Sequence, residues 1–304
     1  MINRRKAISN IALIASSSMF TNACSSQGKT PEGDFKYCLN TSTISGKNPG
    51  ILKYIEIASK AGYDGIEVWI RDIKAFLDEG NSINELNKYI EDHGISVENA
   101  IGFAPWISGG SSGMEQMKEE MEMLALIGGK RIAAPPAGVP ADQPLDFFMA
   151  GEKYAEILEL GRNTGVMPQL EFWGASPVMW HIGQALTVAA SANDPDVRLL
   201  PDIYHMFRGG SGFDSLKMLN GSVIEIFHMN DYVGTIPRLE QTDADRVYPG
   251  DGVGPVKQVL RDLKKMGGVK VLSLELFNRK YWEEDPLLVA KTGLDKMRSL
   301  ANSD

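Results

Sequence analysis

Residues 197–230 read VRLLPDIYHMFRGGSGFDSLKMLNGSVIEIFHMN, and this stretch decides the fold of the chain. It contains two short apolar runs, 197–202 and 224–230, with an amphipathic segment at 212–219 between them. Apolar runs of this length without strict polar alternation are typical of parallel strands that are buried on both faces. We therefore predict a strand, a crossover helix and a second parallel strand, a unit that is almost always right-handed.

The same alternation of short apolar runs and longer amphipathic segments fills the chain from residue 35 onward. Glycine-rich turns such as Gly267-Gly268 end several amphipathic segments, as helix C-caps do. Strands are expected at 36–42, 65–69, 96–102, 131–134, 167–172, 197–202, 224–230 and 271–277. Helices are expected at 49–61, 82–93, 114–127, 142–163, 177–192, 212–219, 255–266 and 284–301.

Eight strands that alternate with eight helices predict a single (β/α)8 TIM barrel over residues 35–304. The alternative is an open, doubly wound α/β sheet. No Gly-x-Gly-x-x-Gly follows the first expected strand, so a nucleotide-binding version of that sheet has no support.

The overall charge argues against nucleic acid as a partner. The 304 residues carry a formal net charge of −8, and lysine and arginine are scattered along the chain. A protein without a broad cationic face lacks the electrostatic footprint that binds phosphate backbones.

The first 24 residues differ from the rest of the chain. Arg4 and Arg5 precede an apolar run over 8–20, and Ala23-Cys24 follows it. A charged start, a short apolar stretch and a small residue before the break are typical of an export signal. Ala23-Cys24 resembles a bacterial lipobox, so Cys24 is the predicted lipidation site. The alternative is a plain secretory signal with a coincidental cysteine.

Residues 25–34, SSQGKTPEGD, are polar and rich in glycine and proline, which is typical of a flexible tether. We expect an exported bacterial protein, periplasmic or held at a membrane through its N-terminal lipid anchor only. Cys38, the second of two cysteines, lies in an expected buried strand, so no structural disulfide is predicted.

Four expected strands end in side chains of metal-binding types: Glu171 in QLEFWG, Asp202 in LLPDIYH, His228 in IFHMND and Glu275 in LSLELFN. These are the last four strands, neighbours around the ring, and the chemistry of such barrels lies at the C-terminal strand ends. Taken singly, Asp202 or Glu275 could cap a helix and His228 could be a core histidine. Together, three carboxylates and an imidazole favour one divalent metal ion, Mn²⁺ before Mg²⁺, Co²⁺ or Zn²⁺.

This set resembles the xylose isomerase-like superfamily of sugar isomerases and epimerases, which includes ketohexose 3-epimerases, inosose dehydratases and endonuclease IV. The resemblance covers residues 36–300. Ketohexose 3-epimerases bind their metal with Glu, Asp, His and Glu from the fifth to eighth strands. The resemblance therefore implies Glu171, Asp202, His228 and Glu275 as metal ligands.

Three more segments look like this superfamily. Asp202-Ile-Tyr-His205 resembles its Asp-x-x-His, and Arg246-Val-Tyr-Pro-Gly-Asp-Gly resembles its Arg-x-x-Pro-Gly-x-Gly, which implies that His205 and Arg246 bind substrate. Ala-Gly-Tyr-Asp-Gly-Ile-Glu67 resembles the second strand of many members. Glu67 is expected to bind a sugar hydroxyl or to pair with Lys130 or Arg131. The loop over 231–245 is longer than in a ketohexose epimerase, so a different substrate pocket is expected.

Three tryptophans are candidates for the pocket wall. Trp69, Trp106 and Trp173 stand at or just beyond the ends of expected strands, where a sugar ring could stack on them. Ordinary packing at the barrel rim is the alternative for each.

The residues and the resemblance together predict a metal-dependent sugar isomerase or epimerase acting on a keto-sugar or related carbohydrate. A cation would stabilise an enediolate while Glu171 and Glu275 serve as catalytic base and acid. Two alternatives stay open: a dehydratase or lyase using the same site on a keto-sugar or keto-glycoside, and a non-catalytic sugar-binding surface lipoprotein. A homo-oligomer is compatible with the sequence.

Overall fold

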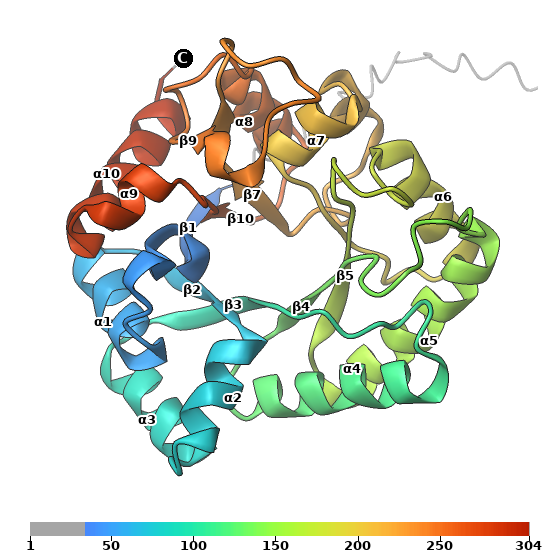
Figure 1. Ribbon diagram of the computed structural model, residues 1–304, viewed down its shortest axis with the longest axis horizontal. Helices are drawn as coiled ribbons and strands as arrows, with labels where there is room; N and C mark the ends of the chain where they lie inside the picture. Colours follow the sequence, from blue (N-terminus) through green and yellow to red (C-terminus); the bar gives the residue numbers. More distant parts are fainter. Residues whose placement is uncertain (1–33, 304) are drawn as a thin grey trace, which may run out of the picture.

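The computed structural model describes residues 34–303. Eight parallel strands surround a central axis and the helices form a ring outside them (Figure 1). The strands are β1 (Phe35–Asn40), β2 (Gly65–Trp69), β3 (Ser96–Ile101), β4 (Arg131–Ala134), β5 (Met167–Glu171), β6 (Leu199–Leu200), β7 (Ile226–Met229) and β10 (Lys270–Leu274).

The strands pair in the order β6-β5-β4-β3-β2-β1-β10-β7. Between β6 and β7, two parallel bridges join Leu199 to Ile224 and Asp202 to His228. These bridges nearly close the ring, which confirms the predicted (β/α)8 barrel and excludes the open sheet. The second bridge also aligns two of the predicted metal ligands.

The outer ring contains ten α-helices within residues 34–303: α1 (Ile51–Ala61), α2 (Ile70–Asp78), α3 (Ile83–Asp92), α4 (Gly110–Ala125), α5 (Phe147–Thr164), α6 (Ile182–Ala192), α7 (Ile203–Gly209), α8 (Val256–Lys265), α9 (Arg279–Glu283) and α10 (Pro286–Ala301). Short 3₁₀ turns occur at η1 (Thr41–Lys47), η2 (Asp214–Met218) and η3 (Asp243–Asp245).

The crossover after β6 differs from the prediction. The expected helix at 212–219 is only the short turn η2, and α7 begins directly after Asp202 instead. The Asp202 carboxylate accepts a hydrogen bond from the His205 backbone N–H at 2.8 Å, which caps α7. The helix ends at Gly210, whose φ of 75° suits glycine. His205 therefore projects from a helix rather than from a strand end.

The long loop over 231–245 is bounded by a small antiparallel pair, β8 (Asp231–Tyr232) and β9 (Arg246–Val247). The Asp231 carboxylate accepts hydrogen bonds from the backbone N–H groups of Gly250, Gly252 and Gly254, at 2.8–3.1 Å. A Cβ atom on Gly252 would lie 2.3 Å from the Tyr232 carbonyl oxygen, so a side chain does not fit there. Asp231 thus holds the segment that brings Arg246 to the barrel mouth.

Cys38 lies in β1 as expected and is buried and free. The predicted export signal, the lipidation site Cys24 and most of the tether lie outside the described residues. Within residues 34–303, no helix combines the length and apolar character needed to cross a membrane.

Candidate metal centre

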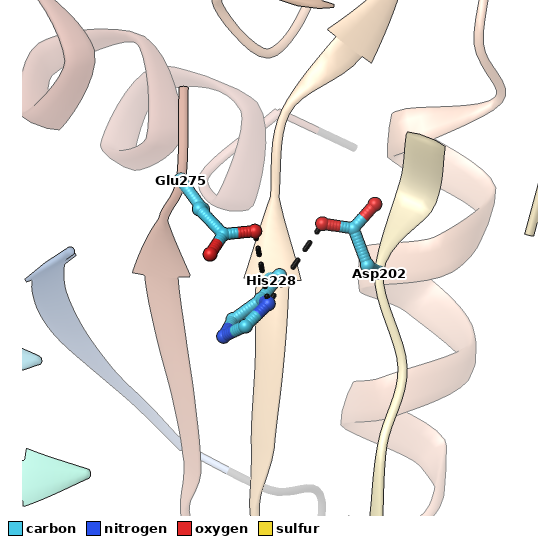
Figure 2. A group of neighbouring side chains, drawn as sticks. All are labelled: Asp202, His228 and Glu275. Carbon is cyan, nitrogen blue, oxygen red and sulfur yellow. Dashed lines mark ion pairs between the residues drawn. The ribbon is translucent and has the colours of Figure 1, made fainter. Parts of the chain in front are cut away.

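Asp202, His228 and Glu275 meet at the C-terminal end of the barrel, as Figure 2 shows. One ligand atom from each lies within 4.8 Å of the others. His228 Nδ1 is 3.2 Å from Glu275 Oε2 and 3.8 Å from Asp202 Oδ2. Asp202 and His228 are fully buried and Glu275 nearly so, so the three polar groups are gathered in a region with little water.

The two ring nitrogens of His228 have different surroundings. Nε2 lies 3.0 Å from Glu67 Oε1, whereas Nδ1 has no hydrogen-bond partner within residues 34–303. Burial opposes a charged imidazole, but Glu275 and Glu67 raise the pKa of His228 well above its usual value. A buried nitrogen that lacks a partner and faces carboxylates is the arrangement expected of a metal ligand.

Glu171 lies at the edge of this group. Its Oε1 atom is 4.0 Å from His228 Nδ1, from the end of β5. Burial raises the pKa of Glu171 to about 8; His228 opposes the rise and the charge of Glu275 adds to it. The structure thus brings the other three predicted ligands within 4.0 Å of His228 Nδ1, with Glu171 the most distant.

Glu67 has a different place from the one expected. It is fully buried, does not line the cavity at the mouth, and contacts neither Lys130 nor Arg131. Since β2 and β7 are not neighbours in the sheet, its contact with His228 crosses the barrel interior. Burial alone would raise the pKa of Glu67, but His228 lowers it below its usual value. Glu67 therefore contacts His228, a predicted ligand, inside the barrel rather than lining the cavity, where a sugar contact was expected.

Asn40 was missed in the sequence and proves central. Its side-chain nitrogen donates to Glu67 Oε2 at 2.8 Å and to Glu275 Oε1 at 3.0 Å. Its side-chain oxygen accepts a hydrogen bond from Trp69 Nε1 at 3.0 Å. In the sequence, Asn40 could have been noticed as a polar residue that ends the apolar run of β1. Asn40 thus connects the predicted ligand Glu275 with Glu67, which contacts His228, and with Trp69 of the cavity wall.

Arg246 lies over the same carboxylates. Its Nη1 donates to Asp202 Oδ2 at 2.9 Å and to Glu275 Oε2 at 2.8 Å. Its Nη2 donates to Asp243 Oδ1 at 2.5 Å and lies 3.2 Å from His205 Nε2. Burial alone would lower the pKa of Arg246, but these carboxylates raise it above its usual value. Arg246 and His205 thus lie beside the predicted metal ligands. Asp243, which pairs with Arg246, was not predicted.

The residues fit a divalent cation. Three carboxylates and one imidazole nitrogen are a suitable donor set for a hard or borderline cation. In this site, His228 Nδ1 is buried without a hydrogen-bond partner among the described residues, so it is available to bind a cation. Arg246 balances part of the carboxylate charge, because its Nη1 pairs with Asp202 Oδ2 and Glu275 Oε2.

A cavity of about 510 Å³ opens above these residues. Glu171, His205, Arg246 and Glu275 line it. Of the three tryptophans expected in the wall, Trp69 and Trp173 line the cavity and Trp106 does not. Trp106 is fully buried, and its Nε1 donates to the Pro135 carbonyl oxygen at 2.7 Å. Ordinary core packing, the alternative considered for each tryptophan, is correct for Trp106.

Comparisons with known proteins agree with this fold. The family model described as xylose isomerase-like TIM barrel matches residues 55–300. Inosose isomerase from Bacillus licheniformis is 29% identical over 278 residues, which span 84% of this chain and 95% of that protein. Fructoselysine 3-epimerase from Escherichia coli is 25% identical over 270 residues, which span 81% of this chain and 92% of that protein. These relatives support the predicted class of isomerase and epimerase enzymes.

Two solved structures show the same fold. The crystal structure of the IOLI protein with a binding zinc atom has a TM-score of 0.80 at 25% identity, covering 88% of this chain and 98% of that chain. D-psicose 3-epimerase in the presence of D-fructose has a TM-score of 0.66 at 16% identity, covering 88% of this chain and all of that one, and shows the fold alone. The zinc atom in the first structure and the cluster in Figure 2 support a divalent metal here. Because the matched residues 55–300 make up most of the sequence, the chain belongs to the xylose isomerase-like TIM barrel family.

Proposed function

We propose that the protein is a metal-dependent sugar isomerase or epimerase that moves a proton at a carbon next to the carbonyl group of a keto-sugar. The main support is that Glu171 and Glu275 both line the cavity and lie 4.0 and 3.2 Å from the same nitrogen of His228. They come from the ends of β5 and β10, with β6 and β7 between them, so they reach the substrate from different directions. Two such carboxylates can serve as base and acid.

The surroundings of the two carboxylates push their pKa values apart. The pKa of Glu171 is raised to about 8, mainly by burial. Burial also opposes ionisation of Glu275, but His228 and Arg246 lower the pKa of Glu275 below its usual value. Before a cation binds, these surroundings therefore favour the protonated form of Glu171 and the ionised form of Glu275. A pair of carboxyl groups in opposite protonation states is the arrangement that acid–base catalysis uses.

The neighbouring side chains would hold the substrate in place. Arg246 and His205 both line the cavity beside the carboxylates, so they can donate to sugar oxygens and fix the position of the reacting carbon. When bound, a divalent cation would supply positive charge that stabilises a developing oxyanion. Asp202, His228, Glu171 and Glu275 are the residues proposed to hold it.

The substrate class rests on the relatives and on the site together. The relatives named above are an inosose isomerase and a fructoselysine 3-epimerase. For this chain we propose a keto-sugar or a related polyhydroxy ketone, because a carbonyl beside a hydroxyl-bearing carbon is what such a pair of carboxylates can act on.

Solvent deuterium exchange tests the proposal. Purified full chain would first be analysed for metal content, then loaded with Mn²⁺ and incubated in D₂O with a panel of keto-sugars. We expect deuterium at a carbon next to the carbonyl, with NMR showing an epimer or isomer as product. Metal-loaded protein that catalyses no exchange with any member of the panel would overturn the proposal.

A further inference from the structure

Four aromatic side chains form a continuous wall in the cavity, which we call the aromatic arc: Trp69, Phe103, Trp173 and Phe277. Phe103 joins two tryptophans, with ring centroids 5.5 Å from Trp69 and 5.9 Å from Trp173. Phe277 continues the arc on the far side of Trp69, at 6.2 Å. Each residue follows or ends a different strand, so the barrel itself sets the arrangement.

The arc presents apolar surface to solvent in an otherwise well-packed barrel. Phe103 is 44% exposed although it lies in the cavity lining, and Trp173 and Phe277 are partly exposed. Trp69 Nε1 donates a hydrogen bond to the side-chain oxygen of Asn40, which holds the Trp69 ring in place. Exposed aromatic rings grouped on one cavity wall indicate a place for a ligand with an apolar face.

The charges around the cavity do not suit a phosphate group. Among the described residues that line it, Arg246 is the one Lys or Arg, and Asp202, Asp243 and Glu275 already pair with it. Arg71 stacks on Trp69 at 4.0 Å, but it pairs with Asp72 and is not a lining residue. A phosphorylated substrate would therefore face carboxylates and aromatic rings rather than a free cation.

The volume of the cavity allows a ligand of drug-like size. Its volume of about 510 Å³ falls within the range of about 300–1,000 Å³ that holds drug-sized ligands. Glu171 and Glu275 line the same cavity as the aromatic arc, so this cavity can hold a ligand that reaches both.

We propose that the aromatic arc binds a second ring of an unphosphorylated substrate, a ring joined to the reacting sugar that the metal centre holds. The identity of the reacting end rests on the proposed function. The second ring needs an apolar face, which either a pyranose ring or an aromatic substituent offers.

Four ligands that share the C2 carbonyl and the C3 hydroxyl group of fructose test this inference. D-fructose provides the sugar alone, isomaltulose adds a pyranose ring, and 1-deoxy-1-(p-toluidino)-D-fructose adds an aromatic ring. Fructose 6-phosphate adds a phosphate group instead. Binding of each to the full chain saturated with Mn²⁺ is measured by isothermal titration calorimetry. We expect at least one two-ring ligand to bind about tenfold or more tightly than fructose, and fructose 6-phosphate to bind no more tightly than fructose.

Variants show whether the arc is responsible. In Phe103→Ala and Trp173→Phe, the dissociation constant of fructose divided by that of the two-ring ligand should fall toward one. Phe148→Ala removes an exposed phenylalanine on α5 outside this cavity and should keep the ratio of the unaltered protein. Circular dichroism establishes that each variant is folded. A preference for the pyranose compound or the aryl compound identifies which kind of ring the arc takes.

Equal binding of fructose and both two-ring ligands, or tighter binding of fructose 6-phosphate, would overturn the inference. The inference would also be overturned if Phe103→Ala and Trp173→Phe both still bound a two-ring ligand more tightly than fructose by the same ratio as the unaltered protein. Deuterium exchange is measured on the same ligands to separate this result from the proposed function. If two-ring ligands bind through the arc but exchange no deuterium, the proposed reaction is wrong and the second-ring site stands. If deuterium is exchanged but two-ring ligands bind no more tightly than fructose, the proposed reaction stands and the second-ring site is wrong.

Discussion

Nε2 of His228 lies 3.0 Å from Oε1 of Glu67, and both side chains are fully buried. Glu67 also accepts hydrogen bonds from Asn99 and Ser273, each at 2.6 Å. This network holds His228 Nε2 against the Glu67 carboxylate and leaves Nδ1 facing the carboxylates at the mouth. A carboxylate behind a histidine ligand orients the ring and makes the ligand more basic.

Substitution Glu67→Gln is expected to weaken Mn²⁺ binding about 10- to 100-fold. The amide oxygen still accepts the histidine hydrogen bond, but the negative charge behind the ring is lost. Isothermal titration calorimetry measures the affinity, and Glu152→Gln on the surface of α5 is the control. An unchanged affinity in folded Glu67→Gln would show that Glu67 has no influence on the site.

Metal binding should stabilise the folded chain. At a Mn²⁺ concentration about 100 times the Kd, linkage adds about 2.7 kcal/mol, which for a chain of this size raises Tm by about 5–10 °C. Asp202→Asn should lose most of this shift, because the amide keeps the cap on His205 but is a poorer ligand. Asp214→Asn in the exposed turn η2 should retain it. A full shift in Asp202→Asn would exclude Asp202 as a ligand.

Glu171→Gln and Glu275→Gln test the assigned acid and base. Each variant should lose about 100-fold or more of the turnover number, since the amide cannot transfer a proton. Metal content measured by mass spectrometry must accompany the kinetics, because both residues are also proposed ligands. Near-wild-type turnover by Glu275→Gln with metal bound would falsify the assignment.

At the other end of the barrel, Glu225 accepts hydrogen bonds from Arg131 and Arg198. Burial alone would raise the pKa of Glu225, but these hydrogen bonds lower it below its usual value. The folded pKa therefore lies below the unfolded value of about 4.3, so the stabilisation is present above that pH and lost as pH falls through the folded pKa. Glu225→Gln should lower the free energy of unfolding by about 1–2 kcal/mol near neutral pH.

Urea unfolding at about pH 7 and about pH 3 checks this sign, with Glu240→Gln on the exposed loop as control. The difference between the unaltered chain and Glu225→Gln should shrink at the lower pH. A difference that grows as the pH falls would contradict it.

The predicted lipid anchor needs a cellular test, because Cys24 lies outside the described residues. Cells that produce the full chain would be given radioactive palmitate. We expect the unaltered chain to be labelled and Cys24→Ser to be unlabelled, with Cys38→Ser as the control. Equal labelling of the Cys24 and Cys38 variants would exclude the anchor.

The sequence by itself determined the barrel and pointed to the four residues proposed to bind a metal. Eight apolar runs each followed by an amphipathic segment leave few other topologies, because a buried parallel strand needs a crossover helix. Polar residues that end consecutive strands must meet at one mouth, so Glu171, Asp202, His228 and Glu275 could be named without coordinates. The periodicity was misleading at 212–219, because the side chain of Asp202 starts α7 earlier.

Only the tertiary structure decided what surrounds these predicted ligands. Glu67, Asn40 and Arg246 are far apart in the chain, and their roles depend on which atoms meet across the closed barrel. Trp106 and Trp69 look alike as aromatic residues near strand ends, yet one lies in the core and the other in the cavity wall. Periodicity along the chain tells which face of a strand is buried. Contacts across the barrel depend instead on register and closure, which long-range packing sets.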